Sequence, residues 1–192
     1  RKSWIGRVNY DYQEKYLAEF LFRRDGSLKF PPDSRWGNFP ALLLAWRASE
    51  ENFWKENLSF INYFKLRGSY GKIGMDPGDP FQYVNKYVLG TGMTLGSSKV
   101  VETIVRQSGV ANPFITWEKQ TTSNIGFEAQ FLNNLFHVEL DLFYNKREDI
   151  LAPRDASVPG FTGLELPDEN IARVDNKGFE LDAGYHKQIN DD

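Results

Sequence analysis

The chain has 192 residues, of which 41% are hydrophobic and 15% aromatic, so it has the length of one domain or of part of a larger one. Its 23 basic and 26 acidic residues give a formal net charge of −3, and this balance provides no electrostatic footprint for nucleic acid. It contains no cysteine, which excludes a disulfide framework and a thiolate metal site.

In most of the first third of the chain, apolar and polar side chains alternate, which is the period of an extended strand with one apolar face; the stretch 39–47 is apolar on both faces, so the period argument is weaker there. We predict four strands here, over residues 4–12, 16–23, 39–47 and 63–73. A tight turn joins the first two strands, and a loop rich in turn-forming residues joins the second to the third. After the third strand, Ser49 followed by Glu50 and Glu51 predicts a single helical turn with Ser49 as its N-cap.

The clearest element of the sequence is a long hairpin over residues 121–145. Apolar residues recur at every second position on both sides of Asn133-Asn134, and asparagine tolerates the positive φ that a tight hairpin turn needs. Each arm has about ten residues, and about 9–11 tilted residues cross the hydrocarbon of a bilayer. A last strand is predicted over residues 178–185. The segments 74–120 and 146–177 are predicted to be long loops, the first with short extended pieces near residues 83–89 and 100–106.

The predicted connections differ in length between the two ends of the strands. Those at residues 13–15 and 132–134 are short, that at 48–60 is of medium length with a helical turn, and those at 24–35, 74–120 and 146–177 are long. This sorting is typical of outer-membrane barrels. Aromatic residues near the predicted strand ends suit the girdles of such barrels; they are Trp4, Tyr12, Tyr16, Tyr63, Tyr144 and Tyr185. We therefore predict an all-β fold of antiparallel up-and-down strands with long loops, as part of a transmembrane β-barrel whose apolar face meets lipid.

A series of sequence blocks also resembles one known family. In chain order, the blocks are Arg24–Ser27, Arg35–Pro40, Ala45–Glu51, Lys65–Gly71, Thr116–Lys119, Asn124–Glu128, Phe143–Lys146 and Asn176–Glu180. This series resembles the barrel of the SusC/RagA-type TonB-dependent receptors of the Bacteroidetes. Ala41, Leu44 and Met75 depart from the usual family pattern, and these departures leave the resemblance intact.

The resemblance implies a large closed barrel in the outer membrane, with an N-terminal plug, energised through TonB. Such a barrel imports glycans or oligopeptides together with a SusD-like surface lipoprotein, and its expected partners are these molecules and the lipid bilayer. We count about seven strands, whereas outer-membrane transporters with a plugged lumen have about 22. Residues 1–192 are therefore expected to form part of the barrel wall, without the plug domain or the closure of the barrel. Neither a cofactor nor nucleic acid is implied.

Two groups of residues are candidates for contact with substrate. Aromatic residues of the predicted loops could stack on sugar rings or peptide side chains, or they could pack the loops against one another or against a lid protein. They are Phe81, Tyr83, Tyr87, Trp117 and Phe161. Charged residues on the polar faces of the strands are expected to line the lumen, and they are Arg7, Glu19, Arg23, Lys65, Arg67, Glu128, Glu139, Asp141, Glu180 and Asp182.

No arrangement of residues predicts catalysis, and we expect that the protein is not an enzyme. His137 and His186 lack acidic or cysteine partners at ligand spacing in the sequence. Asp76 and Asp79 could hold a hard cation, but a turn explains the segment 76–80 with fewer assumptions, and no metal site is predicted. The alternative function is a soluble all-β carbohydrate-binding module, which explains the alternation of the strands but not the sorted loop lengths.

Overall fold

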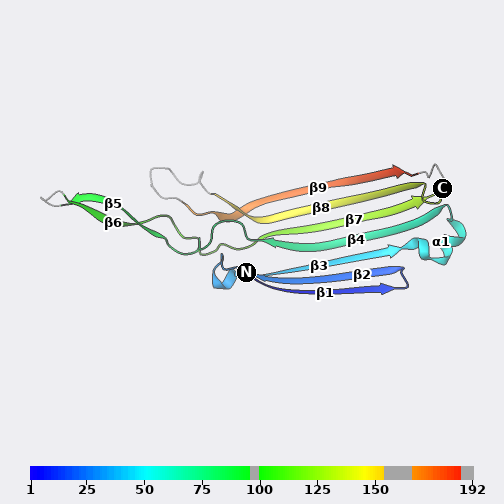
Figure 1. Cartoon of the computed structure of the whole chain (residues 1–192), viewed down its shortest axis with the longest axis horizontal. Coiled ribbons are helices and arrows are strands. Elements are labelled where there is room, and N and C mark those ends of the chain that lie inside the picture. Colours follow the sequence, from blue (N-terminus) through cyan, green and yellow to red (C-terminus); the bar gives the residue numbers. More distant parts are fainter. Residues whose placement is uncertain (96–99, 154–165, 187–192) are drawn as a thin grey trace, which may run out of the picture.

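The computed structural model describes residues 1–95, 100–153 and 166–186. Seven strands form one antiparallel sheet in the order β1-β2-β3-β4-β7-β8-β9 (Figure 1). Their bounds are Lys2–Tyr12, Tyr16–Gly26, Trp36–Arg47, Ile61–Met75, Glu118–Phe131, Phe136–Ala152 and Glu169–Tyr185. Neighbouring strands in the sheet are also consecutive in the chain, except where a separate hairpin of β5 (Tyr87–Leu95) and β6 (Val100–Gln107) intervenes. The predicted all-β, up-and-down fold is confirmed.

The sheet has two unlike ends. At one end lie the short turns after β1 and β7, together with η2 (Ala48–Glu50) and α1 (Asn52–Asn57). At the other end lie the long connections that follow β2, β4 and β8, including η1 (Pro32–Ser34), and the β5–β6 hairpin projects far beyond the sheet (Figure 1). The sorting of loop lengths that the sequence predicts is therefore present with one exception: the β3–β4 connection over residues 48–60, at the short end, is longer than the β2–β3 connection over residues 27–35. No helix among the described residues is long and apolar enough to cross a membrane.

The turns at the short end need left-handed backbone conformations. Asn133 and Asn134 have φ values of 59° and 65°, which confirms the predicted turn. The prediction of Ser49 as a helix N-cap is wrong, because α1 begins only after Glu51 and no side chain caps it. The Glu51 carboxylate instead accepts hydrogen bonds from Tyr16 Oη at 2.8 Å and from Lys15 Nζ at 3.1 Å. The hydrogen bond from Tyr16 and that from Lys15 lower the pKa of Glu51, and they tie this segment to the β1–β2 turn.

Several strands extend further toward the loop end than the alternation of apolar residues predicts. β8 continues to Ala152 and β9 begins at Glu169, so much of the predicted loop over residues 146–177 is strand. Tyr144 therefore lies in the middle of β8 and not near a strand end as predicted. The physical reason is that a β-ladder is held by backbone groups, which pair whether or not one face of the strand is apolar.

The register divides the sheet into an apolar face and a polar face, because antiparallel partners point to the same side. The apolar face carries alternate residues of the stretches 4–12, 16–22, 40–46, 64–70, 121–131, 136–144 and 179–185, and none of these is charged. We call them the apolar band. Its members on the outer strands are open, with Val8 66% and Phe179 70% exposed. A large apolar surface is therefore left uncovered by the described residues.

The strands β3 and β4 pair only from Ala41–Gly71 to Arg47–Lys65, although each continues to pair with its other neighbour toward the loop end. Pro40 lies directly before the last pair, and proline cannot donate a ladder hydrogen bond. We call the unpaired junction between Trp36–Pro40 and Lys72–Met75 the seam. Beside it lies the main buried cluster of the described residues, which consists of Phe30, Phe39, Ile115 and Trp117.

Candidate functional site on the polar face and in the loops

The ten charged residues predicted to line a lumen all lie on the polar face of the sheet. Seven of them fall in two adjacent rows of the register: Lys65, Glu128, Glu139 and Asp182 in one, and Arg67, Asp141 and Glu180 in the other. The remaining three, Arg7, Glu19 and Arg23, belong to β1 and β2. Alternation along each strand brings these charges together from separate parts of the sequence.

An ion-pair cluster occupies the centre of the polar face. The Arg67 guanidinium on β4 extends across β7 and contacts the carboxylates of Glu139 and Asp141 on β8. Lys65 Nζ lies 3.2 Å from Glu128 Oε1, and Arg67 Nη1 lies 3.6 Å from the same oxygen. On β4, β7, β8 and β9, with Glu180 and Asp182 included, the two rows hold five carboxylates and two cations, or a formal charge of 2 − 5 = −3. This part of the polar face is therefore acidic and favours cationic or hydrogen-bond-donating groups.

Gly126 on β7 leaves room for the Arg67 side chain to extend from β4 to Asp141 on β8. It pairs with Arg67 on one side and with Asp141 on the other, so its missing side chain leaves the space in which the two charges meet. A Cβ at this position would lie 2.4 Å from Asp141 Oδ1 and 2.7 Å from the backbone oxygen of Leu140. The backbone oxygen cannot move aside as a flexible side chain can, so the sheet itself would have to shift.

We expect Gly126→Ala to destabilise the sheet by about 1–3 kcal/mol, because it overfills a packed position. The measurement is the temperature at which the full-length protein in detergent loses its heat-modifiable migration in a gel. The matched control is Gly68→Ala, also in the centre of the sheet, where the nearest atom to a new Cβ would be 3.9 Å away. Equal transition temperatures for the two variants would contradict the assigned role of Gly126.

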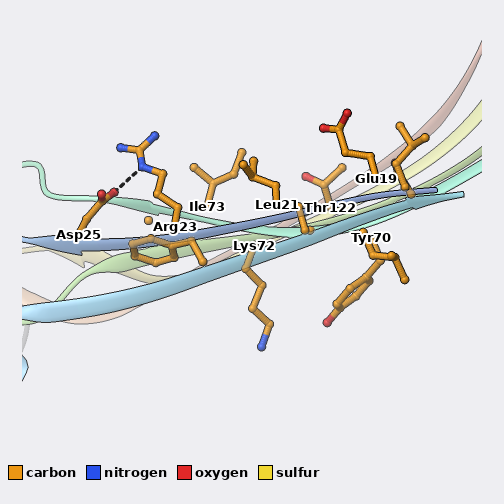
Figure 2. A pocket seen from close by; sticks show the side chains of 15 residues that line it. Glu19, Leu21, Arg23, Asp25, Tyr70, Lys72, Ile73 and Thr122 are labelled. Carbon is orange, nitrogen blue, oxygen red and sulfur yellow. Dashed lines mark ion pairs between the residues drawn. The ribbon is translucent and has the colours of Figure 1, made fainter. Parts of the chain in front are cut away.

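A hollow of about 440 Å³ lies along the seam. On the polar face it is lined by Glu19, Leu21, Arg23, Ile73 and Thr122, whereas Tyr70 and Lys72 point to the opposite side of the sheet (Figure 2). Arg23 and Asp25 form an ion pair of 2.8 Å at its rim. The strand patterns do not predict this hollow, and its one signal in the sequence is a proline inside a strand pattern, at Pro40. The hollow can accept an apolar side chain from whatever covers the polar face.

The predicted loop aromatics do not form one group in the structure. Phe81 and Tyr87 are 49% and 64% exposed, and both are accessible to a ligand. Tyr83 packs against the buried cluster. Trp117 is only 4% exposed and packs between Phe30 and Phe39, so it fills the alternative role of holding the loops together and is not open to stacking on a substrate. Phe161 lies outside the described residues.

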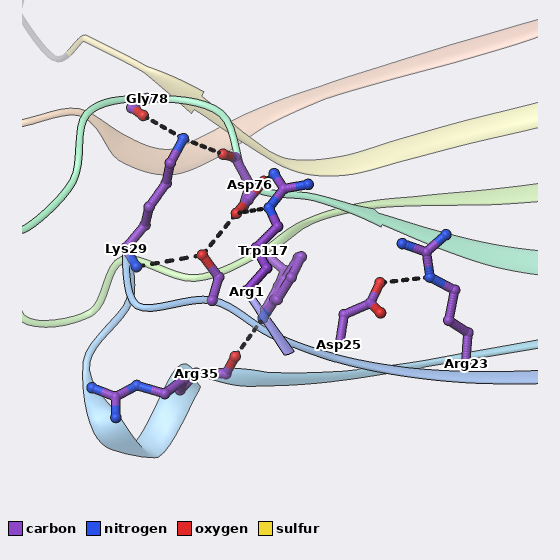
Figure 3. Close-up of polar contacts among 9 residues, drawn as sticks. Arg1, Arg23, Asp25, Lys29, Arg35, Asp76, Gly78 and Trp117 are labelled. Atoms are coloured by element: carbon purple, nitrogen blue, oxygen red, sulfur yellow. Dashed lines mark hydrogen bonds and ion pairs between the residues drawn. The ribbon is translucent and has the colours of Figure 1, made fainter. Parts of the chain in front are cut away.

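Trp117 and Asp76 fix the base of the long loops (Figure 3). The ring of Trp117 lies 5.2 Å from that of Phe30 and 5.4 Å from that of Phe39, and its Nε1 donates to the backbone oxygen of Arg35 at 3.3 Å. The buried carboxylate of Asp76 pairs with Arg1 and accepts a hydrogen bond from Ser27 Oγ at 2.7 Å. The Asp76 carboxylate, which the sequence offered as a possible cation ligand, is thus engaged by the Arg1 guanidinium and the Ser27 hydroxyl.

One histidine–carboxylate pair is present on the described part of the polar face. His137 Nε2 does lie 3.0 Å from Asp182 Oδ1, contrary to the expectation that His137 has no acidic partner; the register places the two close together on neighbouring strands. Both side chains are largely exposed, and a catalytic pair needs a third group to orient the histidine. Among the described residues, no group of three or more His, Cys, Asp or Glu side chains could hold a metal ion.

Comparisons with known proteins agree on one family. The family model described as "TonB dependent receptor-like, beta-barrel" matches residues 3–190. The chain is 35% identical to TonB-dependent receptor P26 of Formosa agariphila over 179 residues, which are 93% of this chain and 18% of that protein. It is 33% identical to TonB-dependent receptor SusC of Bacteroides thetaiotaomicron over 181 residues, which are again 93% and 18%. The matched relatives are receptors and importers.

A structural comparison gives the same fold. The RagAB peptide importer in its "closed-closed" state superposes with a TM-score of 0.82 at 21% identity, over 99% of this chain and 20% of that one. The siderophore receptor PirA of Pseudomonas aeruginosa superposes with a TM-score of 0.58 at 16% identity, over 93% and 30%. The chain thus spans about a fifth of the length of the curated relatives that it matches.

Proposed function

Because this chain belongs to the family of TonB-dependent receptor β-barrels, we propose that it forms part of the wall of an outer-membrane transporter of the SusC/RagA type. The transporter imports glycans or oligopeptides. The observation that carries the proposal is that seven consecutive sheet strands combine an uncharged face with a face rich in charges. The names of the relatives, among them a SusC receptor and a peptide importer, support both the family and the class of substrate.

The apolar band is the lipid-facing surface in this proposal. On β1 it runs from Trp4 to Tyr12 and on β8 from Phe136 to Tyr144, nine residues in each case. About 9–11 tilted residues span the hydrocarbon of a bilayer. The band has this height on β1, β7 and β8, and it is seven residues long on the other four strands. Tyr12, Tyr16 and Trp46 are partners in one row at the short-turn end, where aromatic residues suit the membrane interface.

The polar face borders the aqueous passage. Its central cluster of Arg67 with Glu128, Glu139 and Asp141 is held in place by ion pairs, and the remaining carboxylates give the wall a negative charge. The ten predicted charged residues are the proposed lumen lining, and most of them are paired with one another or solvated. The acidic excess favours a plug surface or a substrate that presents amino groups or hydroxyl groups.

The long-loop end forms the outer rim of the transporter. Phe81 and Tyr87 are the exposed candidates for stacking on sugars or peptide side chains, and the Tyr83 ring lies 6.2 Å from that of Phe81. A SusD-like lipoprotein covers this rim, and TonB supplies the energy through the N-terminal parts of the full-length protein. The free edges of the sheet, β1 and β9, pair with further strands of the full-length barrel, because unpaired edge strands invite aggregation.

The runner-up is a soluble carbohydrate-binding module, and the apolar band argues against it. A soluble sandwich buries the apolar face of each sheet under a second sheet about 10 Å away. Among the described residues, no second sheet covers Val8, Phe179 or Leu181, which are each more than 60% exposed. A soluble protein with that surface would be expected to aggregate.

The test is to express the full-length gene and to fractionate the cells. We expect the product to partition into the outer membrane, to migrate differently in a gel with and without heating, and to support growth on a glycan or a peptide as sole source of carbon. A monomeric product in the soluble fraction would refute the proposal and favour the binding module. An outer-membrane barrel without any effect on uptake would refute the transport function but not the barrel wall.

A further inference from the structure

A row of cations borders the apolar band on the side of the long loops. On six of the seven sheet strands, the next residue on the same face beyond the long-loop end of the band is Lys or Arg. It lies two positions from the last band residue of its strand. These residues are Lys2, Arg24, Lys72, Lys119, Lys146 and Lys177, and we call them the basic belt. The exception is β3, which has Asn38 at this position. The recurrence on six strands shows that the belt belongs to the face of the sheet and not to one loop.

The opposite border of the band has a different composition. At the short-turn end, the corresponding positions of the described residues include Ala48, Asn62, Asn133 and Asn134, and Glu14 is the charged one among them. Among the positions that the structure describes, the cations are therefore confined to the long-loop border. A belt that served only to end the apolar surface would be expected at both borders.

Four of the six belt cations have no carboxylate partner among the described residues. Lys2 Nζ lies 5.7 Å from the centroid of the Trp4 ring, and Arg24 Cζ lies 5.2 Å from that of Trp36, contacts that leave both charges unneutralised. Lys72 and Lys177 are exposed and make no ion pair with a described residue. Lys72 points away from the polar face, to the same side as Tyr70 (Figure 2).

The other two belt cations are paired, and the belt nevertheless keeps a positive charge. Lys146 Nζ lies 2.6 Å from Glu148 Oε1, and Lys119 Nζ lies 2.9 Å from Asp149 Oδ2. Asp175, on the same face of β9, lies 2.7 Å from Arg173. Counting Arg173 with the belt gives seven cations and three carboxylates, so the formal net charge is 7 − 3 = +4. This contrasts with the whole chain, whose formal net charge is −3.

We propose that the basic belt binds the phosphate groups of anionic lipid headgroups in the leaflet on the long-loop side. This inference rests on the proposed function, since it needs the apolar band to lie in a bilayer. Lipid chains then contact the band, and their headgroups meet the cations directly beyond it, at the depth where long Lys and Arg side chains reach the interface. Trp4 and Trp36 at the same border suit that depth as well. The belt fixes the height and tilt of the wall, and it selects charged over zwitterionic lipids.

The test uses the full-length protein, purified in a non-ionic detergent and incubated with mixed micelles of equal amounts of phosphatidylglycerol and phosphatidylcholine. After repurification, the lipids that remain bound are quantified. We expect phosphatidylglycerol to be enriched several-fold over phosphatidylcholine, and the enrichment to fall as sodium chloride is raised, because salt screens exposed charges. The double variant Lys72→Gln/Lys177→Gln is expected to lose most of this several-fold enrichment, because each cation near the membrane surface adds to the attraction of anionic lipids.

The matched control is Lys86→Gln/Arg106→Gln, which removes the same charge from the region of the β5–β6 hairpin and is expected to leave the enrichment unchanged. Equal retention of the two lipids by the wild type would overturn the proposal. So would equal losses in the two double variants, or complete displacement of phosphatidylglycerol by inorganic phosphate, which would indicate a site for the free anion. Heat-modifiable migration is measured on every sample. If it is absent from the wild type, the barrel proposal fails; if it is present without lipid selectivity, only the belt proposal fails.

Discussion

Trp117→Ala is expected to open the base of the long loops. Trp117 is 4% exposed and joins Phe30, from the β2–β3 loop, to Phe39 at the seam. Removal of a buried Trp side chain costs about 3–5 kcal/mol, and the change also removes one of the two donors to the Arg35 carbonyl, the other being the Ser27 N–H. A loss of this size raises the population of the locally open form by about two to four orders of magnitude. Limited proteolysis of the full-length protein within residues 76–117 is therefore expected to become faster by a similar factor.

Trp117→Phe is the matched control for this experiment. It keeps an aromatic ring between Phe30 and Phe39 and removes only the hydrogen bond to Arg35, so a loss of about 1 kcal/mol is expected. If Trp117→Ala is cleaved no faster than the wild type, the buried cluster does not hold the loops. If cleavage is faster but uptake of the transported nutrient is unchanged, Trp117 has a structural role only, as its burial indicates.

Glu118→Ala is expected to loosen the irregular part of β8. The Glu118 side chain is buried, pairs with Arg147, and accepts a hydrogen bond from the backbone N–H of Leu151 at 2.9 Å. The β8–β9 register shifts between Arg147 and Ile150, and Asp149 has a φ of 57°. The carboxylate thus satisfies a backbone donor beside this irregularity. Its removal is expected to cost about 3 kcal/mol, the lower end of the range for breaking a buried ion pair. The lower end applies because Arg147 is partly exposed, so that water screens its charge.

The measurement is hydrogen–deuterium exchange of a peptide that covers residues 147–153 in the full-length protein. Exchange in Glu118→Ala is expected to be about two orders of magnitude faster than in the wild type. Glu118→Gln keeps an oxygen for the Leu151 N–H and removes only the charge, so its exchange rate is expected to lie between the two. An unchanged rate in Glu118→Ala would show that the irregular segment is held by its backbone pairing alone.

The outline of the sheet could be predicted because each strand carries its own pattern. Alternation in the stretches around Val8, Phe127 and Leu140 indicates which side chains share a face, and Asn133-Asn134 marks a turn. These signals are local, since a period of two and a positive φ depend on neighbours in the chain. Because alternation along each strand separates its two faces, all ten charged residues assigned to the polar faces lie on one face of the sheet.

The ends of the strands could not be predicted in the same way. Strands β8 and β9 continue through polar residues such as Asn145, Asn176 and Lys177, because backbone pairing requires no apolar side chains. The helix after β3 begins at Asn52 and not beside Ser49, since its position is set by contacts of Glu51 with Lys15 and Tyr16 on another hairpin. Such contacts join residues more than thirty positions apart, and no local pattern reports them.

The sequence alone determined the class of fold, the two unlike faces of the strands and the sorting of the loops, because these depend on spacing along one strand. Only the tertiary structure decided that Trp117 is a packing residue while Phe81 and Tyr87 are open. It also decided that Arg67 crosses Gly126 to reach Asp141, and that six cations from six strands stand in one belt. Each of these facts depends on which strands are neighbours and in what register. Register is fixed by the whole sheet, so the chemistry of its surfaces emerges only when the strands have paired.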